Sequence, residues 1–300
     1  GFKMSSIDDK LNEVLNIADE VIEKQVEKNP LEVIKSSDQF FCISHFNGDI
    51  SWVKNIKKDN YIIYNKSGSN IDHITKNNIS IDNVGYNIYS YLKFIIHNYE
   101  NLPSVTVFCK DNIFTRHISI ELFLRLINRK SFTSLETDST RCDFPVNLNI
   151  SDNGFVEINN SWYKFSYPRK FFSEYNEFYS YIFKDYNLPD FVRFAPGANF
   201  IVPKENILLR SKNFYKNLLK FIDYAKLSCE SHFLERSLNT IFNSNVQSSD
   251  IMNNEISNEE LIFLKERCSL QISKENKLIN KIKNSISVKA LYLIYRILKL

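Results

Sequence analysis

Three short apolar runs, each followed by a polar turn, constrain the fold of this chain more than any other feature. Residues 39–46, 61–64 and 105–109 are rich in β-branched, aromatic and other apolar residues, and polar residues follow each run. Helix-like segments separate them, which gives the order strand, helix, strand, loop, helix, strand. This alternation is typical of an α/β fold with a mostly parallel sheet flanked by helices. We therefore predict that the three strands are neighbours in one parallel sheet.

Composition excludes several classes of protein. The chain has 300 residues, of which 43% are hydrophobic and only 6 are glycine, and it contains no glycine-rich phosphate-binding motif. Its 38 basic and 35 acidic side chains are too evenly balanced to indicate a nucleic-acid-binding protein. The five cysteines are widely spaced, and no apolar run approaches the roughly 20 residues of a membrane span. We therefore expect a cytoplasmic protein without structural zinc or nucleic acid as a partner.

The sequence pattern divides the chain into three parts. These are an N-terminal amphipathic helix at 1–36, an α/β domain at 37–245, and a linker with basic amphipathic helices at 246–300. Residues 5–29 carry a heptad-like apolar stripe, so this helix either packs on the domain or mediates homo-oligomerisation. Residues 274–300 are basic, with no acidic residue after position 275. This tail either packs on the domain or lies on the inner surface of an anionic membrane as a peripheral contact.

Further elements are expected within and after the domain. Residues 118–130, 212–226 and 231–243 have the apolar spacing of amphipathic helices. The run Asp152-Asn153-Gly154 lies between two short alternating segments and predicts a β-hairpin. Residues 244–258 are polar and are expected to form a linker or loop.

Polar side chains follow the predicted strands at the edge where α/β sheets bind ligands. Asp49 and Asn65 come after the first and second strands, Lys66 is next to Asn65, and Lys110 and Asp111 follow the third strand. Because the carboxyl ends of parallel strands meet at one edge, we expect these side chains to converge there. The alternative is that Asp and Asn only form the turns that end the strands, which is their common role.

Three stretches, in this order and spacing, resemble an uncharacterised family that is catalogued only as a domain of unknown function. The stretches are Asp49–Val53 with Ile63–Lys66, then Asn83-Val84-Gly85 with Asn98–Phe108, and then Pro196–Val202 with Leu234-Glu235-Arg236. That family looks like glycosyltransferases of the GT-A fold, and it is similar to capsule- and rhamnan-type sugar transferases. The resemblance covers roughly residues 40–243 and implies a GT-A-like, mostly parallel sheet flanked by helices, with added N- and C-terminal helices.

The resemblance also implies a function and a donor site. A glycosyltransferase of this type would transfer a sugar from a nucleotide-sugar to a surface polysaccharide or glycolipid. Asp49, Asn65, Lys66, Asn83 and Lys110 would bind the donor. The leaving diphosphate carries negative charge, which needs a divalent metal or cationic side chains.

The negative charge of the leaving diphosphate could be neutralised in two ways at the donor site. Asp111 stands where the resemblance places an acidic metal-binding motif, so it would hold Mn²⁺ or Mg²⁺. Lys110 or Lys66 could instead neutralise the phosphates directly, without a metal.

Two residues are candidates for the base that deprotonates the acceptor hydroxyl. Glu235 lies in an otherwise apolar helical pattern, where burial would raise its pKa towards a useful range. The alternative is that Glu235 pairs with Arg236 and fastens its helix to the sheet. His117 is the second candidate, since the resemblance implies a histidine nearby, although a single histidine is often structural.

The chain differs from the family pattern at two places. Tyr86 and Asn87 stand where the family has an arginine and an acidic residue, and Lys110 and Asp111 stand where it has Gln-Gly. These differences motivate an alternative function, in which the chain is a catalytically inactive relative that serves as a binding or scaffold protein in polysaccharide assembly.

Overall fold

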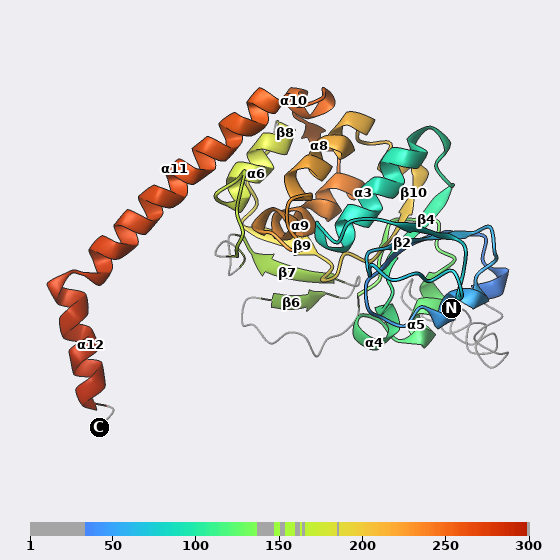
Figure 1. Ribbon diagram of the computed structural model, residues 1–300, viewed down its shortest axis with the longest axis horizontal. Helices are drawn as coiled ribbons and strands as arrows, with labels where there is room; N and C mark the ends of the chain where they lie inside the picture. The colour runs from blue at the N-terminus through green and yellow to red at the C-terminus, as the bar shows by residue number, and fades with distance from the viewer. Residues whose placement is uncertain are drawn as a thin grey trace, which may run out of the picture.

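A mostly parallel six-stranded sheet forms the centre of the protein (Figure 1). The computed structural model describes residues 34–136, 147–150, 154–159, 163, 166–184 and 186–298. Across the sheet, the strand order is β3-β2-β1-β4-β10-β5. The strands are β1 (Phe40–His45), β2 (Tyr61–Asn65), β3 (Asn78–Ser80), β4 (Val105–Lys110), β5 (Thr133–Ser134) and β10 (Phe200–Pro203). The predicted N-terminal helix at 5–29 lies outside the described residues.

The three predicted strands are neighbours and run parallel. Cys42 of β1 lies opposite Ile62 of β2 on one side and Phe108 of β4 on the other. Strand β3 extends this parallel set, whereas β10 pairs antiparallel with both β4 and β5. The prediction of a mixed α/β fold with a mostly parallel sheet flanked by helices is therefore confirmed.

Both faces of the sheet are buried, which explains why its central strands are continuous apolar runs. Cys42 and Phe108 pack with helices α3 (Tyr86–Asn98), α8 (Lys212–Ile222) and α9 (Cys229–Asn243). Ile43 and Val107 point to the opposite face, where they pack with the 3₁₀ helix η1 (Ser51–Asn55) and with α5 (Ile120–Leu126). Helix α5 lies within the predicted segment 118–130. The short elements η2 (Tyr99–Asn101), α4 (Ile113–Arg116) and α7 (Lys204–Ile207) complete the connections around the sheet.

Two small sheets lie beside the central one. The first contains β6 (Asn147–Ile150), β7 (Gly154–Ile158) and β9 (Phe191–Phe194), all antiparallel. Ile150 of β6 pairs with Gly154 of β7, so the predicted hairpin is confirmed. The second pairs β8 (Phe183–Lys184), which follows α6 (Tyr175–Ile182), with β11 (Gln247–Ser248).

The segment 244–258 is not a plain linker. It contains β11 and helix α10 (Asp250–Asn253), and Met252 and Ile256 are buried in the same core as α8 and α9. The reason is that Met252 and Ile256 pack into this core, although most residues of the segment are polar. Asn217 of α8 fixes the segment by donating hydrogen bonds to the backbone oxygens of Met252 (3.1 Å) and Asn254 (2.7 Å).

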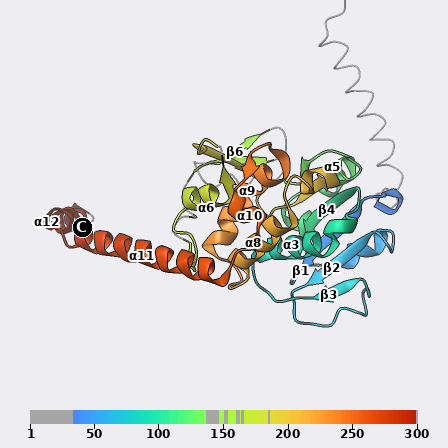
Figure 2. The ribbon, with the colours of Figure 1, turned by 90° about the horizontal axis from the view of Figure 1, so that it is seen from above.

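Two long helices follow. Helix α11 (Asn258–Lys283) runs away from the packed body, and α12 (Ile286–Leu298) lies at its far end (Figures 1 and 2). Within the described part of the chain, no helix combines the length and the apolar character that crossing a membrane requires.

Candidate functional site

A cavity of about 400 Å³ lies at the carboxyl ends of the parallel strands. The chain leaves β1 for β2 on one side and later returns to β4 on the other side, so the direction of winding changes between β1 and β4. In open α/β sheets, ligands bind at such a switch point because the loops leaving the two strands diverge there. The cavity is bordered by residues that follow β1, β2 and β4 and by the start of α3. Its lining includes Lys66, Asn83, Tyr86, Asn87, Lys110 and Asp111.

Asp111 joins the loop after β4 to the loop after β1. Its Oδ2 atom accepts hydrogen bonds from the backbone N–H groups of Phe46 (2.9 Å) and Gly48 (2.8 Å), and it lies 2.8 Å from His45 Nδ1. Its Oδ1 atom accepts a hydrogen bond from Asn112 N (2.8 Å). A Cβ atom at Gly48 would lie only 2.6 Å from Asp111 Cγ, so the loop requires glycine for this close approach.

The surroundings of Asp111 keep it ionised but do not suit a metal. Burial alone would raise the pKa of Asp111, but the hydrogen bonds from His45, Phe46 and Gly48 outweigh burial and lower it. Both carboxylate oxygens are already engaged, and Mn²⁺ or Mg²⁺ requires several oxygen ligands. Among the described residues, no group of three or more His, Cys, Asp or Glu side chains could hold a metal ion. The donor set therefore does not fit the divalent metal expected at Asp111.

Lys66 supports the turn that starts α3. Gly85 and Tyr86 both have positive φ, +61° and +55°, and Lys66 Nζ donates hydrogen bonds to the backbone oxygens of Val84 and Tyr86. The ammonium group also lies 5.5 Å from the centre of the Tyr89 ring. Burial, together with repulsion from Lys110, lowers the pKa of Lys66 to about 7. Lys66 is thus a buried cation that can lose its proton near neutral pH.

Lys110 also lines the cavity, close enough to Lys66 to repel its charge. Its Nζ atom donates a hydrogen bond of 2.9 Å to the Tyr86 hydroxyl, and its backbone N–H donates one of 2.9 Å to Asn199 Oδ1. Arg116 of α4 and Lys226 add two further cationic side chains to the lining, and Asp111 is the one acidic residue among the described lining residues. Four cations against one carboxylate give the cavity a positive potential that favours anions.

The side chain of Asn87, a residue of the cavity lining, is only partly hydrogen-bonded. Its Nδ2 atom donates to the Tyr91 hydroxyl (2.8 Å) and to the backbone oxygen of Gly197 (2.6 Å). Its Oδ1 atom is buried and has no hydrogen-bond partner, although the side chain is only 4% exposed. Buried polar atoms are nearly always satisfied, so this oxygen is an exception within the lining.

The loop around Gly197 joins Asn87 to two of the predicted catalytic residues. Gly197 N donates to Glu235 Oε2 (3.2 Å), while Gly197 O accepts from Asn87. A Cβ atom at Gly197, whose φ is +84°, would lie 2.3 Å from His117 Cε1. Glu235 and His117 therefore lie behind this loop, and neither lines the cavity.

Both residues have partners in the protein interior. His117 Nδ1 lies 2.5 Å from Glu136 Oε2, and both side chains are buried. Glu235 Oε1 accepts from Arg236 (2.9 Å), which also donates to Glu157 Oε2 (2.9 Å). Burial raises the pKa of Glu235, although the Arg236 guanidinium and the Gly197 N–H act in the opposite direction. The geometry matches the alternative in which Glu235 fastens its helix by an ion pair.

Two predicted donor residues lie outside the cavity because their side chains form local turns. Asp49 is exposed, and its carboxylate accepts hydrogen bonds from the N–H and hydroxyl of Ser51 (both 2.8 Å) at the start of η1. Asn65 Oδ1 accepts from Ser67 N (3.0 Å), and its Nδ2 donates to Ser69 O (2.7 Å). Neither is among the lining residues, whereas the predicted Lys66, Asn83, Lys110 and Asp111 are.

Sequence reasoning missed several lining residues. Tyr86 and Asn87 stood out only as differences from the family pattern, and Arg116 follows the third strand without a recognisable motif. Lys226 reaches the cavity because Tyr86 N donates to Lys226 O (2.8 Å) and Gly85 N donates to Ala225 O (2.8 Å). Nothing in the sequence around Lys226 indicates this long-range pairing.

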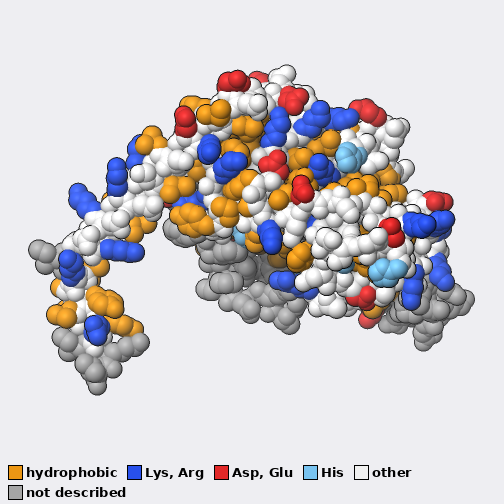
Figure 3. Space-filling model, viewed as in Figure 1, with side chains coloured by type: hydrophobic (Ala, Val, Ile, Leu, Met, Phe, Trp, Pro, Cys, Tyr) orange, Lys and Arg blue, Asp and Glu red, His pale blue; other side chains and the backbone are white. Residues whose placement is uncertain are grey.

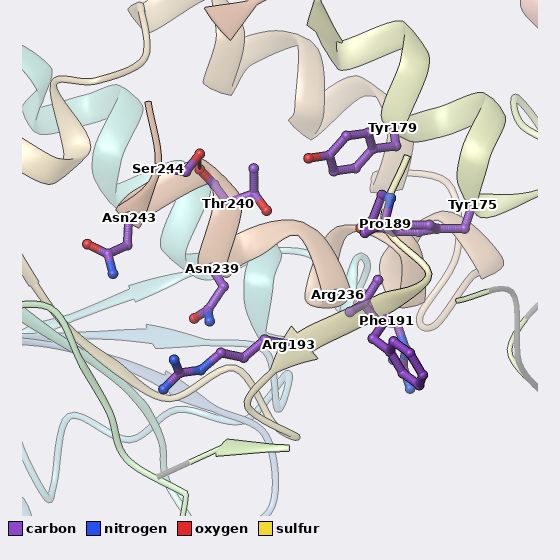
Figure 4. A pocket seen from close by; sticks show the side chains of 11 residues that line it. Tyr175, Tyr179, Pro189, Phe191, Arg193, Arg236, Asn239, Thr240, Asn243 and Ser244 are labelled. Carbon is purple, nitrogen blue, oxygen red and sulfur yellow. Dashed lines mark hydrogen bonds between the residues drawn. The ribbon is translucent and has the colours of Figure 1, made fainter. Parts of the chain in front are cut away.

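A second cavity of about 330 Å³ lies beside α9 (Figure 4). Asn239, Thr240 and Asn243 of α9 line one wall, and Tyr175 and Tyr179 of α6 line another. The two cavities share no lining residue. The cavity at the switch point is the better candidate site because it lies at the ligand-binding edge of the sheet and collects the cationic side chains.

Comparison with known proteins gives a family without an activity. No curated protein and no solved structure matches the chain. A family profile with the description "Protein of unknown function (DUF3431)" matches residues 43–256, which is more than half of the chain. The matched region begins in β1 and ends just before α11, and it includes all of the cavity lining. The resemblance to an uncharacterised family is thereby confirmed, and the chain belongs to the DUF3431 family.

Proposed function

We propose that this chain is a glycosyltransferase that binds a nucleotide-sugar with its diphosphate in the switch-point cavity. The single observation that supports this most is the position of four cationic side chains at the carboxyl edge of a parallel sheet. Lys66, Lys110, Arg116 and Lys226 line the cavity with one carboxylate among them. A diphosphate carries the charge that this lining favours, and its place at a switch point is where nucleotide ligands bind in α/β folds. The GT-A-like character of the fold is part of the same proposal.

In this reaction, the bond between the anomeric carbon of the sugar and the β-phosphate oxygen breaks. A new bond forms between that carbon and an acceptor hydroxyl of a polysaccharide or glycolipid, and the hydroxyl proton passes to a base. The diphosphate leaves with additional negative charge. Lys110 and Lys66 would stabilise this charge directly, which is the role that a metal or fixed cations play in such transfers. Asp111 then positions the loops of β1 and β4, because its oxygens are occupied by hydrogen bonds.

A second candidate function is a catalytically inactive nucleotide- or sugar-binding protein. The observation that favours it is the engagement of both predicted catalytic carboxylates. Asp111 accepts four hydrogen bonds, and Glu235 pairs with Arg236 and Gly197 behind the cavity wall. Under this alternative, the cationic cavity binds a nucleotide-sugar but no positioned base completes the transfer.

Thermal-shift and calorimetric binding measurements test the shared part of both candidates. Ligands that bind only the folded state raise its apparent stability. UDP-, GDP-, CMP- and dTDP-sugars would be compared, each with and without Mn²⁺. We expect one nucleotide class to bind without a metal requirement, and Lys110→Gln to weaken that binding about tenfold or more. Lys58→Gln, at an exposed position outside the cavity, is the matched control and should bind as the unmodified chain does.

Product analysis then separates the two candidates. Incubation of the bound nucleotide-sugar with lipid-linked or polysaccharide acceptors should release the free nucleotide if the chain is a transferase, a nucleoside diphosphate from UDP-, GDP- or dTDP-sugars and CMP from a CMP-sugar. Binding without any release would favour the inactive binding protein. If no nucleotide, nucleotide-sugar or inorganic diphosphate binds, or if the Lys110 and Lys58 variants bind equally, the proposal is wrong.

A further inference from the structure

The first part of helix α11 is fixed to the body of the protein. Leu264 and Cys268 are buried, and Leu264 belongs to the main core. Arg267 forms an ion pair of 2.7 Å with Glu177, and Glu275 forms one of 3.3 Å with Arg169. Among the described side chains, Glu275 is the last acidic residue along the chain, and it marks the end of this anchored part.

Beyond Glu275, α11 and α12 form an arm, residues 276–298, that projects from the body (Figures 1 and 2). Large apolar side chains along the arm are exposed to solvent. They are Leu278, Ile279, Ile282, Leu291, Leu293 and Ile294. Leu291 and Leu293 are 66% and 61% exposed. Contiguous exposed apolar surface on a water-soluble fold marks a place that another surface covers.

The arm carries charge of one sign. Its basic side chains are Lys277, Lys281, Lys283, Lys289 and Arg296, and residues 276–298 contain no Asp or Glu. Figure 3 shows lysine and arginine side chains beside hydrophobic ones along the projecting part. An excess of cations next to exposed apolar side chains complements a surface that is both anionic and apolar.

The two basic residues of α12 lie together on one side of the helix. Lys289 and Arg296 are seven residues apart, which places them on the same face of a helix with 3.6 residues per turn. Ala290, Leu291 and Ile294 are spaced by one, three and four residues and share a different face. Ser285 begins the helix by accepting a hydrogen bond from Val288 N (3.3 Å) through its hydroxyl oxygen. Leu293, four residues after Lys289, lies beside the cations. A helix with its cations on one side and exposed apolar side chains on the other can lie in the plane of a membrane surface, with the apolar side among the acyl chains.

We infer that the arm binds the surface of an anionic lipid bilayer. A second copy of the chain is a poorer occupant. Pairing two arms would bring their basic side chains together without any acidic partner on either arm. An anionic bilayer offers negative headgroups to the basic side chains and acyl chains to the apolar side chains. Because the first part of α11 is fixed to the body, binding of the arm would also attach the body to the bilayer.

Vesicle flotation of the full chain tests this inference. Vesicles of phosphatidylcholine alone are compared with vesicles that also contain phosphatidylglycerol, at low and at high salt. We expect flotation with the anionic vesicles at low salt, and its loss in high salt or with neutral vesicles, because screening removes the attraction between charges. Leu291→Gln with Ile294→Gln, and separately Lys289→Gln with Arg296→Gln, should each weaken binding to anionic vesicles about tenfold.

The matched control for the apolar pair is Ile262→Gln with Leu270→Gln. These residues are 56% and 58% exposed but lie on the anchored part of α11. Lys58→Gln with Lys265→Gln is the control for charge. Both controls should float as the unmodified chain does, and equal melting temperatures would show that all variants fold.

Two results would overturn the inference. In the first, the arm variants float as well as the controls do. In the second, sedimentation shows a dimer that the arm variants abolish, while the unmodified chain does not bind anionic vesicles. This readout does not depend on nucleotide binding or sugar transfer, so its failure is separable from failure of the proposed function.

Discussion

The carboxylate of Asp111 and the imidazole of His45 meet at 2.8 Å where the neighbouring strands β4 and β1 end. The same carboxylate oxygen accepts hydrogen bonds from the N–H groups of Phe46 and Gly48, so one side chain closes the loop of β1 against the loop of β4. This arrangement sets the position of the cavity wall at the switch point. Removal of the Asp111 carboxylate should therefore lower the stability of the fold, whether or not it also changes any chemistry in the cavity.

The stability of the protein should fall in acid because of Asp111. Its hydrogen bonds lower the pKa of the folded carboxyl below the usual value, so the unfolded chain binds a proton more readily. The resulting stabilisation is present above the unfolded pKa, about 4, and is lost as pH falls through the folded pKa. We expect Asp111→Asn to lower the free energy of unfolding at neutral pH by about 1–3 kcal/mol.

The same variant should have a weaker dependence of stability on acid pH, measured by urea unfolding at a series of pH values. Asp49→Asn is the control for a carboxylate that joins no distant segments. The hydrogen bonds from Ser51 lower the pKa of Asp49 too, but Asp49 is exposed and these bonds are local, so its replacement should change stability much less. If Asp111→Asn unfolds at the same urea concentration as the unmodified chain, Asp111 does not hold the two loops together.

Gly197 should tolerate no larger residue. A Cβ atom there would lie 2.3 Å from His117 Cε1, which is buried against Glu136, and φ is +84°. Gly68 has a similar φ of +75°, but a Cβ atom there would meet nothing within 4 Å. Both alanine variants therefore carry backbone strain of about 1 kcal/mol, and Gly197→Ala adds a steric clash of roughly 1–3 kcal/mol.

Urea unfolding of the two alanine variants isolates the clash, since the backbone strain is common to both. We expect Gly197→Ala to be clearly less stable than Gly68→Ala. Equal stability of the two would mean that the loop shifts away from His117 without cost, and that the contact does not position Glu235.

The Glu157–Arg236–Glu235 network should contribute more to stability than to binding. Arg236 bridges both carboxylates, and its guanidinium lies 4.4 Å from the centre of the Tyr163 ring. Arg236→Met would leave two buried carboxylates without their cation, which costs about 3–5 kcal/mol. Glu235→Gln removes one charge and should cost less. Thermal unfolding measures both effects, and nucleotide affinity should stay within about twofold in Glu235→Gln.

If Glu235→Gln instead keeps its melting temperature and loses only the release of nucleoside diphosphate, Glu235 is the base. That outcome would contradict a structural role. The conservative variant Glu235→Asp separates the two further, since a shorter carboxylate weakens the contact with Gly197 N while keeping the charge.

The strand arrangement was predictable from sequence because burial on both faces leaves a simple signal. Phe41, Cys42 and Ile43 are apolar without alternation, and they face two different cores. Each apolar run also stops where its strand reaches the edge of the sheet. The residues at the end of the third run, Lys110 and Asp111, could therefore be predicted to lie at the cavity. The same reasoning failed for Asp49 and Asn65, since the position after a strand does not determine whether a side chain points into the cavity or closes its own turn.

The rest of the site depends on contacts between distant segments. Lys226 joins the lining through backbone pairing with Tyr86, 140 residues earlier in the chain. The role of Asn87 depends on the backbone of Gly197 and on an oxygen left without a partner, neither of which has a local sequence signature. For Glu235, the neighbouring Arg236 indicated an ion pair, but Glu157 and the Gly197 loop became evident only in three dimensions.

Lys66 should couple nucleotide-sugar binding to proton uptake. Burial beside Lys110 lowers the pKa of Lys66 to about 7, whereas an unfolded lysine titrates near 10.5. Stability therefore rises with pH between these values, because the unfolded chain holds a proton that the folded chain releases.

A bound diphosphate favours the protonated amine of Lys66, so the affinity for a nucleotide-sugar should rise as pH falls towards about 7, by at most about tenfold per pH unit, and level off below it. Calorimetry with a nucleotide-sugar, whose diphosphate does not titrate in this range, measures the effect. Lys66→Gln should remove the dependence, while Lys226→Gln should weaken binding and retain it; an unchanged slope in Lys66→Gln would assign the proton elsewhere.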